Sequence, residues 1–72
     1  MRQKSLVLFE DQHYVACLVA NRTILTVQRK RDGEETSGKA IEGDLAKEWS
    51  AAFETADDAS ESRALCRAVL SA

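Results

Sequence analysis

The chain has 72 residues, of which 44% are hydrophobic and 31% are charged, and its net charge is −2. A chain of this length forms one small domain that buries only about 60% of the surface its unfolded form exposes, which leaves little room for both a core and a deep cleft. The longest apolar run, residues 15–20, is far shorter than the roughly 20 residues of a membrane-spanning helix. We therefore expect a single domain over residues 1–72, cytoplasmic and without membrane contact.

Three segments have the composition of β-strands: residues 6–9, 13–20 and 23–29 are rich in apolar or β-branched side chains. Asn21 and Arg22 separate the second segment from the third. Because Asn tolerates a positive φ, we expect a two-residue hairpin loop at this point. The three segments together predict an antiparallel meander.

The third segment alternates, so Leu25 and Val27 would face the core while Thr26 and Gln28 face away. We expect Trp49 and Phe53 to anchor the helices on one set of apolar strand residues: Leu6, Leu8, Val15, Cys17, Leu25 and Val27. The other face of the sheet would carry a second set: Tyr14, Ala16, Leu18 and Ile24. Apolar area would then remain exposed on that face.

The dipeptide Asp32-Gly33 is a strong signal for a two-residue turn that continues the meander. Such a hairpin would bring opposite charges face to face in two cross-strand pairs, Arg31 with Glu34 and Lys30 with Glu35. Each pair is worth about 0.2–1 kcal/mol. The residues after the turn have little β-propensity, so the sequence leaves open whether residues 34–43 form a short fourth strand, a helix or a loop.

The rest of the chain has helical periodicity. An apolar stripe at helical spacing runs through Leu45, Trp49, Ala52, Phe53 and Ala56. Asp44 is the expected N-cap of this helix, because Gly43 just before it interrupts any earlier helix.

A second helix is predicted to start at Asp58. The segment Asp58-Ala59-Ser60-Glu61 has the spacing of a capping box, with Asp57 as the competing cap. Its apolar stripe is Ser62, Leu65, Cys66, Val69 and Ala72. Strands followed by helices predict an α+β fold, in which a three-stranded or four-stranded antiparallel meander is followed by two short helices packed on one face.

No residue pattern indicates catalysis. His13 is the only histidine, and the two cysteines, Cys17 and Cys66, lie far apart, so the spacing of neither residue type predicts a metal site. The adjacent acidic pairs all fall at predicted turns or caps, which explains them structurally. Glycines occur without the Lys-Ser/Thr ending of a phosphate-binding loop. We therefore expect a protein that is not an enzyme and that needs no cofactor or metal.

Surface charge is the remaining functional signal, because residues 1–41 carry a net charge of +2 and residues 42–72 a net charge of −4. An acidic helical face suits a basic protein partner. We expect a small regulatory subunit, adaptor or inhibitor that binds another protein, or a second copy of itself, through this face and the exposed sheet face. The residues predicted to bind a partner are Asp44, Glu48, Glu54, Asp57, Asp58, Glu61 and Tyr14.

The alternative is a nucleic-acid-binding module, because three consecutive basic residues at a strand end suit phosphate contacts. Its binding residues would be Arg22, Arg29, Lys30, Arg31 and Lys39. The negative net charge and the scarcity of aromatic residues for base stacking count against this alternative.

In its size, its acidity and its lack of catalytic motifs, the chain resembles small phage-encoded inhibitors of bacterial defence or host enzymes. The resemblance implies an inhibitory protein–protein contact. It assigns no function to a particular residue.

Overall fold

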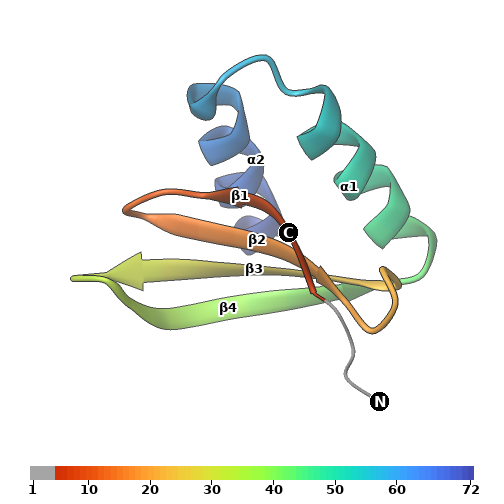
Figure 1. Cartoon of the computed structure of the whole chain (residues 1–72), viewed down its shortest axis with the longest axis horizontal. Coiled ribbons are helices and arrows are strands. Elements are labelled where there is room, and N and C mark those ends of the chain that lie inside the picture. Colours follow the sequence, from red (N-terminus) through yellow and green to blue (C-terminus); the bar gives the residue numbers. More distant parts are fainter. Residues whose placement is uncertain (1–4) are drawn as a thin grey trace.

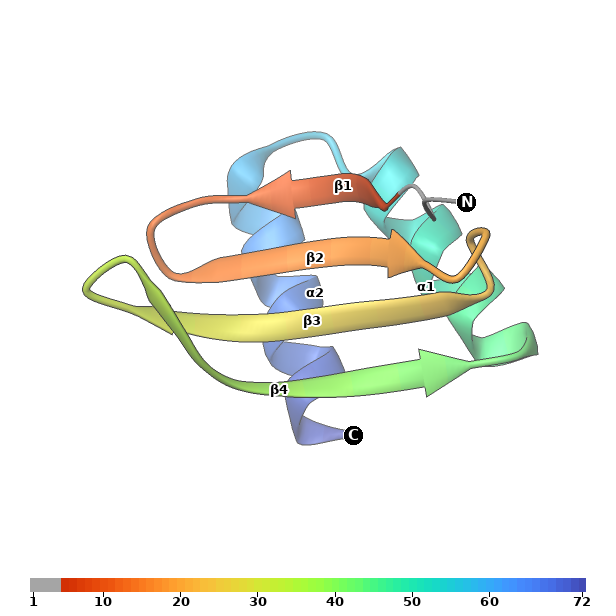
Figure 2. The same cartoon turned by 60° about the horizontal axis from the view of Figure 1, so that its bottom comes forward.

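The computed structural model describes residues 5–72 and has the α+β architecture that the sequence predicts. Four strands form an antiparallel sheet in the order β1-β2-β3-β4, and both helices lie on one face of it (Figures 1 and 2). The elements are β1 (Leu6–Glu10), β2 (Tyr14–Val19), β3 (Ile24–Arg31), β4 (Glu34–Glu42), α1 (Asp44–Thr55) and α2 (Ala59–Ser71). No helix within the described residues is both long enough and apolar enough to span a membrane.

The helix-covered face of the sheet carries the core. Leu18 pairs with Leu25 and Ala16 pairs with Val27, and all four side chains are buried. They pack with four residues of the helices, Ala46, Phe53, Cys66 and Val69. The inward direction of Leu25 and Val27 is therefore confirmed.

The side assignment of β2 predicted from the sequence is wrong. Ala16 and Leu18 lie in the core rather than on the exposed face, while Val15 and Cys17 lie on the side away from the helices. Residues 15–19 are apolar at every position, so the alternation of this strand does not mark one face. A shift of one residue then exchanges the two faces.

The β2–β3 connection is longer than the predicted two-residue loop. Val19 and Ile24 form the last strand pair, so four residues lie between the strands. Three of them, Ala20, Asn21 and Arg22, have positive φ values of 52°, 57° and 66°. At the end of the loop, the Thr23 hydroxyl donates to the Ala20 carbonyl oxygen at 2.6 Å, and the Thr23 N–H is shared between the Val19 and Ala20 carbonyl oxygens.

The Asp32-Gly33 turn and its register are confirmed, since Arg31 pairs with Glu34 and Lys30 with Glu35 along the strands. Residues 34–42 form a nine-residue strand, which answers the question left open by their low β-propensity. The expected cross-strand ion pairs do not form among residues 5–72, because Lys30 instead contacts Glu10 of β1. The β3–β4 pairing has an irregularity between Arg29 and Lys30 of β3, where the register shifts by one residue.

Helix α1 differs from its prediction at its start and in its buried stripe. Gly43, with φ 72°, is the N-cap, and Asp44 is the first helical residue, without a side-chain cap. Leu45 is 58% exposed, and the buried positions are Ala46, Ser50 and Phe53. Ser50 tolerates burial because its hydroxyl is donated to the Ala46 carbonyl oxygen at 2.6 Å.

The predicted start of α2 is confirmed. The Asp58 carboxylate accepts the Glu61 N–H at 2.9 Å, and the Glu61 carboxylate accepts the Asp57 N–H at 3.1 Å. This reciprocal arrangement satisfies backbone donors at the helix start. The buried residues of α2 are Ser62, Cys66 and Val69, as its periodicity predicts.

Candidate functional site

A hollow of about 320 Å³ lies where β2 begins and β3 ends, beside α2. Figure 2 shows these segments together at the end of the sheet that holds the β1–β2 and β3–β4 turns. Because most of its side chains are cationic, we name this hollow the basic pocket. It is lined by His13, Tyr14, Arg29, Lys30, Ser60, Arg63 and Arg67.

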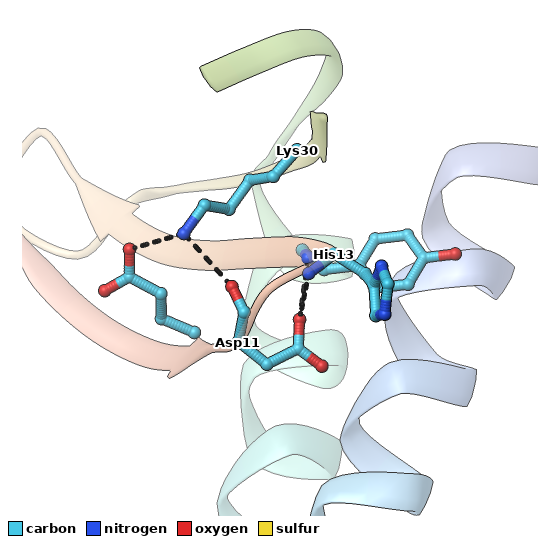
Figure 3. Close-up of polar contacts among 5 residues, drawn as sticks. Asp11, His13 and Lys30 are labelled. Carbon is cyan, nitrogen blue, oxygen red and sulfur yellow. Dashed lines mark hydrogen bonds and ion pairs between the residues drawn. The ribbon is translucent and has the colours of Figure 1, made fainter. Parts of the chain in front are cut away.

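The wall formed by the β1–β2 turn is held by Asp11 (Figure 3). Its Oδ1 atom accepts the backbone N–H groups of His13 at 2.7 Å and Tyr14 at 2.8 Å. Lys30 adds a second tie, because its Nζ donates to the Asp11 carbonyl oxygen at 3.0 Å and to Glu10 Oε2 at 3.1 Å. The turn therefore presents His13 and Tyr14 from a fixed backbone.

Asp11 also faces α2. Its Oδ2 atom lies 3.2 Å from Arg63 Nε, which links the turn to the helix. Partial burial favours the neutral carboxyl, but the N–H groups of His13 and Tyr14 and the Arg63 charge outweigh it, so the pKa of Asp11 lies below its ordinary value. Arg63 Nε is buried and has no hydrogen bond of good geometry, so the contact with Asp11 is an ion pair whose angle is poor.

Two further arginines face the pocket without a carboxylate partner. Arg29 comes from β3 and Arg67 from α2, one turn after Arg63, and both are exposed. Within the described part of the chain, no ion pair or side-chain hydrogen bond engages either guanidinium. Their donors are available to a ligand.

The structure brings together only some of the residues predicted to bind nucleic acid. Arg29 and Lys30 line the basic pocket, and Arg31 lines an adjacent hollow between the two turns. Arg22 lies in the loop before β3, at the other end of the sheet, and Lys39 pairs with Val27 in the middle of β4. The sequence reasoning missed Arg63 and Arg67, although Ser60, Arg63 and Arg67 share one helical face by their spacing.

The acidic residues predicted to bind a partner are all exposed: Asp44, Glu48, Glu54, Asp57, Asp58 and Glu61. Asp58 and Glu61 cap α2, and the Asp57 backbone N–H takes part in the same arrangement. Tyr14, predicted to lie on an exposed sheet face, is half-buried on the helix side and lines the basic pocket.

The face of the sheet away from the helices is a second candidate surface, which we name the open face. Strand pairing places Val7, Cys17, Thr26 and Ala40 in one row across all four strands. Val19 and Ile24 form the neighbouring pair towards the β2–β3 loop. Val7 is 54% exposed, and Cys17, Val19 and Ile24 are half-buried, with no helix of the described part of the chain over them.

The cysteines offer little reactivity. Burial, and to a smaller extent the Asp11 charge, raises the pKa of the Cys66 thiol to about 12. Burial and the carboxylates of Glu35 and Glu10 raise the pKa of Cys17. No group of three or more potential metal ligands occurs within residues 5–72.

Comparisons with protein-family models, curated proteins and solved structures found no match to this chain. Its function is therefore inferred from the basic pocket and the open face.

Proposed function

We propose that this protein is a non-catalytic protein-interaction module that acts through the open face of its sheet. The observation that carries the proposal is that both helices cover the same face of the sheet (Figure 2). Among the described residues, this leaves Val7 exposed and Val19 and Ile24 half-buried on the open face. Exposed apolar side chains that gather on one face can mark an interaction site. The two free thiols, Cys17 and Cys66, support a reducing compartment such as the cytoplasm.

The proposed occupant of the open face is a second copy of the chain. The row across the centre holds small side chains, Cys17, Thr26 and Ala40, which allow two sheets to approach to the usual spacing of about 10 Å. Four strands about 4.8 Å apart and about six residues long give a flat area of roughly 400 Å² per copy. Both copies together then bury about 800 Å², which is below the roughly 1,200–2,000 Å² of stable specific interfaces, so the dimer is weak and its population depends on concentration.

Two exposed apolar residues on opposite sides of the molecule provide the test. Val7 lies on the open face and Leu45 on α1, with exposed fractions of 54% and 58%. We expect light scattering after size exclusion to show a molar mass that rises towards the dimer with concentration. Val7→Glu should abolish that rise, while Leu45→Glu, the matched control, should leave it unchanged.

Two results would contradict the proposal. One is a monomer at every concentration reached. The other is an equal effect of Val7→Glu and Leu45→Glu, which would indicate association through charge or through the helices. Retention of the Val7→Glu fold is checked by circular dichroism, because an edge-strand substitution that unfolds the chain gives no information on the open face.

A further inference from the structure

We propose that the basic pocket binds a small phosphomonoester, whose phosphoryl oxygens are held by Arg29, Arg63 and Arg67. This site is distinct from the open face and requires no dimer.

The first support is that three arginines from separate elements line one hollow. Arg29 is on β3, and Arg63 and Arg67 are one turn apart on α2, yet all three line one hollow. Like charges brought together in this way repel one another unless an anion lies between them. Guanidinium groups present paired N–H donors that match the oxygens of a phosphoryl group.

The second support is that two of these arginines are not engaged within the described residues and the third is engaged only in part. Arg29 and Arg67 have no ion-pair partner among residues 5–72, whereas Arg63 uses its buried Nε for the ion pair with Asp11 while its side chain remains 44% exposed. Within residues 5–72, Asp11 is the only carboxylate in an ion pair with a pocket arginine, so it balances one of three guanidinium charges. The chain as a whole is acidic, which makes this local excess of positive charge more distinctive.

The helix N-terminus of α2 adds little to this argument. Asp58 and Glu61 already cap it, and both carry negative charge. The binding energy must therefore come from the arginines, with the Ser60 hydroxyl as a neutral donor on the pocket wall.

The size and surroundings of the pocket favour a small ligand over a nucleic-acid strand. A hollow of about 320 Å³ is at the lower end of the range for small-molecule sites. A longer polyanion leaving it across the two turns would meet three carboxylates, Glu10, Asp11 and Asp32. Only two cations, Lys30 and Arg31, line the same adjacent hollow, so that path has no excess of positive charge. Tyr14 and His13 provide flat side chains beside the arginines, so a phosphate attached to a ring is the best fit.

Titration of the full chain at low salt tests the proposal, with amide NMR shifts and calorimetry as readouts. The probes are inorganic phosphate, adenosine 5′-monophosphate and adenosine. We expect the monophosphate to bind more tightly than inorganic phosphate, adenosine not to bind, and the largest shifts to fall at Tyr14, Arg29 and Arg67. Added salt should weaken binding, because the pocket is open to solvent.

Charge-neutralising variants identify the site. Arg67→Gln and Arg29→Gln should each weaken monophosphate binding by about tenfold, the effect of one lost charge-assisted contact. Arg22→Gln is the matched control, since it removes the same charge at the other end of the sheet. It should leave affinity within about twofold, as should Val7→Glu if the pocket is independent of the open face.

The proposal is overturned if inorganic phosphate and the monophosphate cause no shifts, or if all three arginine variants weaken binding equally. It is also overturned if a single-stranded oligonucleotide without a terminal phosphate binds more tightly than the monophosphate. That result would indicate recognition of the phosphodiester backbone of a strand. Failure of dimerisation with intact monophosphate binding would contradict the proposed function alone.

Discussion

Lys30 of β3 reaches past β2 to Glu10 of β1, with its Nζ 3.1 Å from Glu10 Oε2 and 3.0 Å from the Asp11 carbonyl oxygen. The lysine side chain is 15% exposed, so it is shielded more than an ordinary surface cation. Its backbone N–H also donates to the His13 carbonyl oxygen at 2.7 Å. Lys30 thus links the β1–β2 turn to β3.

Lys30→Met removes the contacts of the ammonium group with Glu10 and the Asp11 carbonyl oxygen and keeps a long apolar side chain. We expect the free energy of unfolding in urea to fall by about 1–2 kcal/mol, the loss of two charge-assisted contacts. Arg31→Met is the matched control on the adjacent exposed position, where no ion pair is made within residues 5–72, and it should change stability by less than about 0.5 kcal/mol. Equal effects of the two variants would show that the Lys30 contacts contribute nothing.

Asp11 makes stability depend on acid pH. Its pKa is lowered in the folded state, so its contribution is present above the unfolded pKa of about 3.9 and is lost as the pH falls through the folded value. Asp11→Asn should reduce stability at pH 7 and flatten the decline of stability below about pH 4. Urea unfolding at several pH values measures both effects, and an unchanged acid decline would contradict the assignment.

Gly38 is required by a close approach between β3 and β4. A Cβ atom there would lie 2.6 Å from Gln28 Cγ and 3.0 Å from the Val27 carbonyl oxygen. Gly38→Ala should therefore cost about 1–3 kcal/mol. In a Gln28→Ala background the cost should be smaller but not zero, because the backbone contact remains, whereas Ser37→Ala on the same strand should be nearly neutral.

The two thiols should differ in access. Cys17 is half-buried on the open face, while Cys66 is fully buried in the core. We expect a maleimide to modify one cysteine in the native protein and two in denaturant, counted by mass spectrometry. Native modification of Cys66 at the same rate as Cys17 would indicate opening of the core.

Much of the fold follows from local patterns, because turns and caps are encoded by a few adjacent residues. Asp32-Gly33 and Asp58-Glu61 illustrate this, since each is satisfied by its own chain neighbours. Local patterns did not predict which side chains of β2 face the core, because this strand is apolar on both faces. A loop at Asn21 and Arg22 implies a register that puts Leu18 opposite Leu25, and this register, unlike the composition of the strand, predicts the core face of β2.

The basic pocket could not be predicted from local sequence patterns. Arg29 and Arg67 are far apart in the sequence, and they share a hollow only because α2 crosses the sheet beside the end of β3. The helical spacing of Ser60, Arg63 and Arg67 is visible in the sequence, but the strand that this face meets is not. The same limit applies to Lys30, whose partner Glu10 belongs to a strand two places away in the sheet.

The order of strands in the sheet equals their order in the chain, and this has a consequence for synthesis and folding. Every strand pair closes a short loop, so the entropic cost of forming the sheet is low. The ribosome releases all four strands before α1 and α2, which means that the core face of a nascent sheet is bare until residues 44–71 emerge. The interval before the helices dock is therefore the stage at which this chain is most exposed to aggregation.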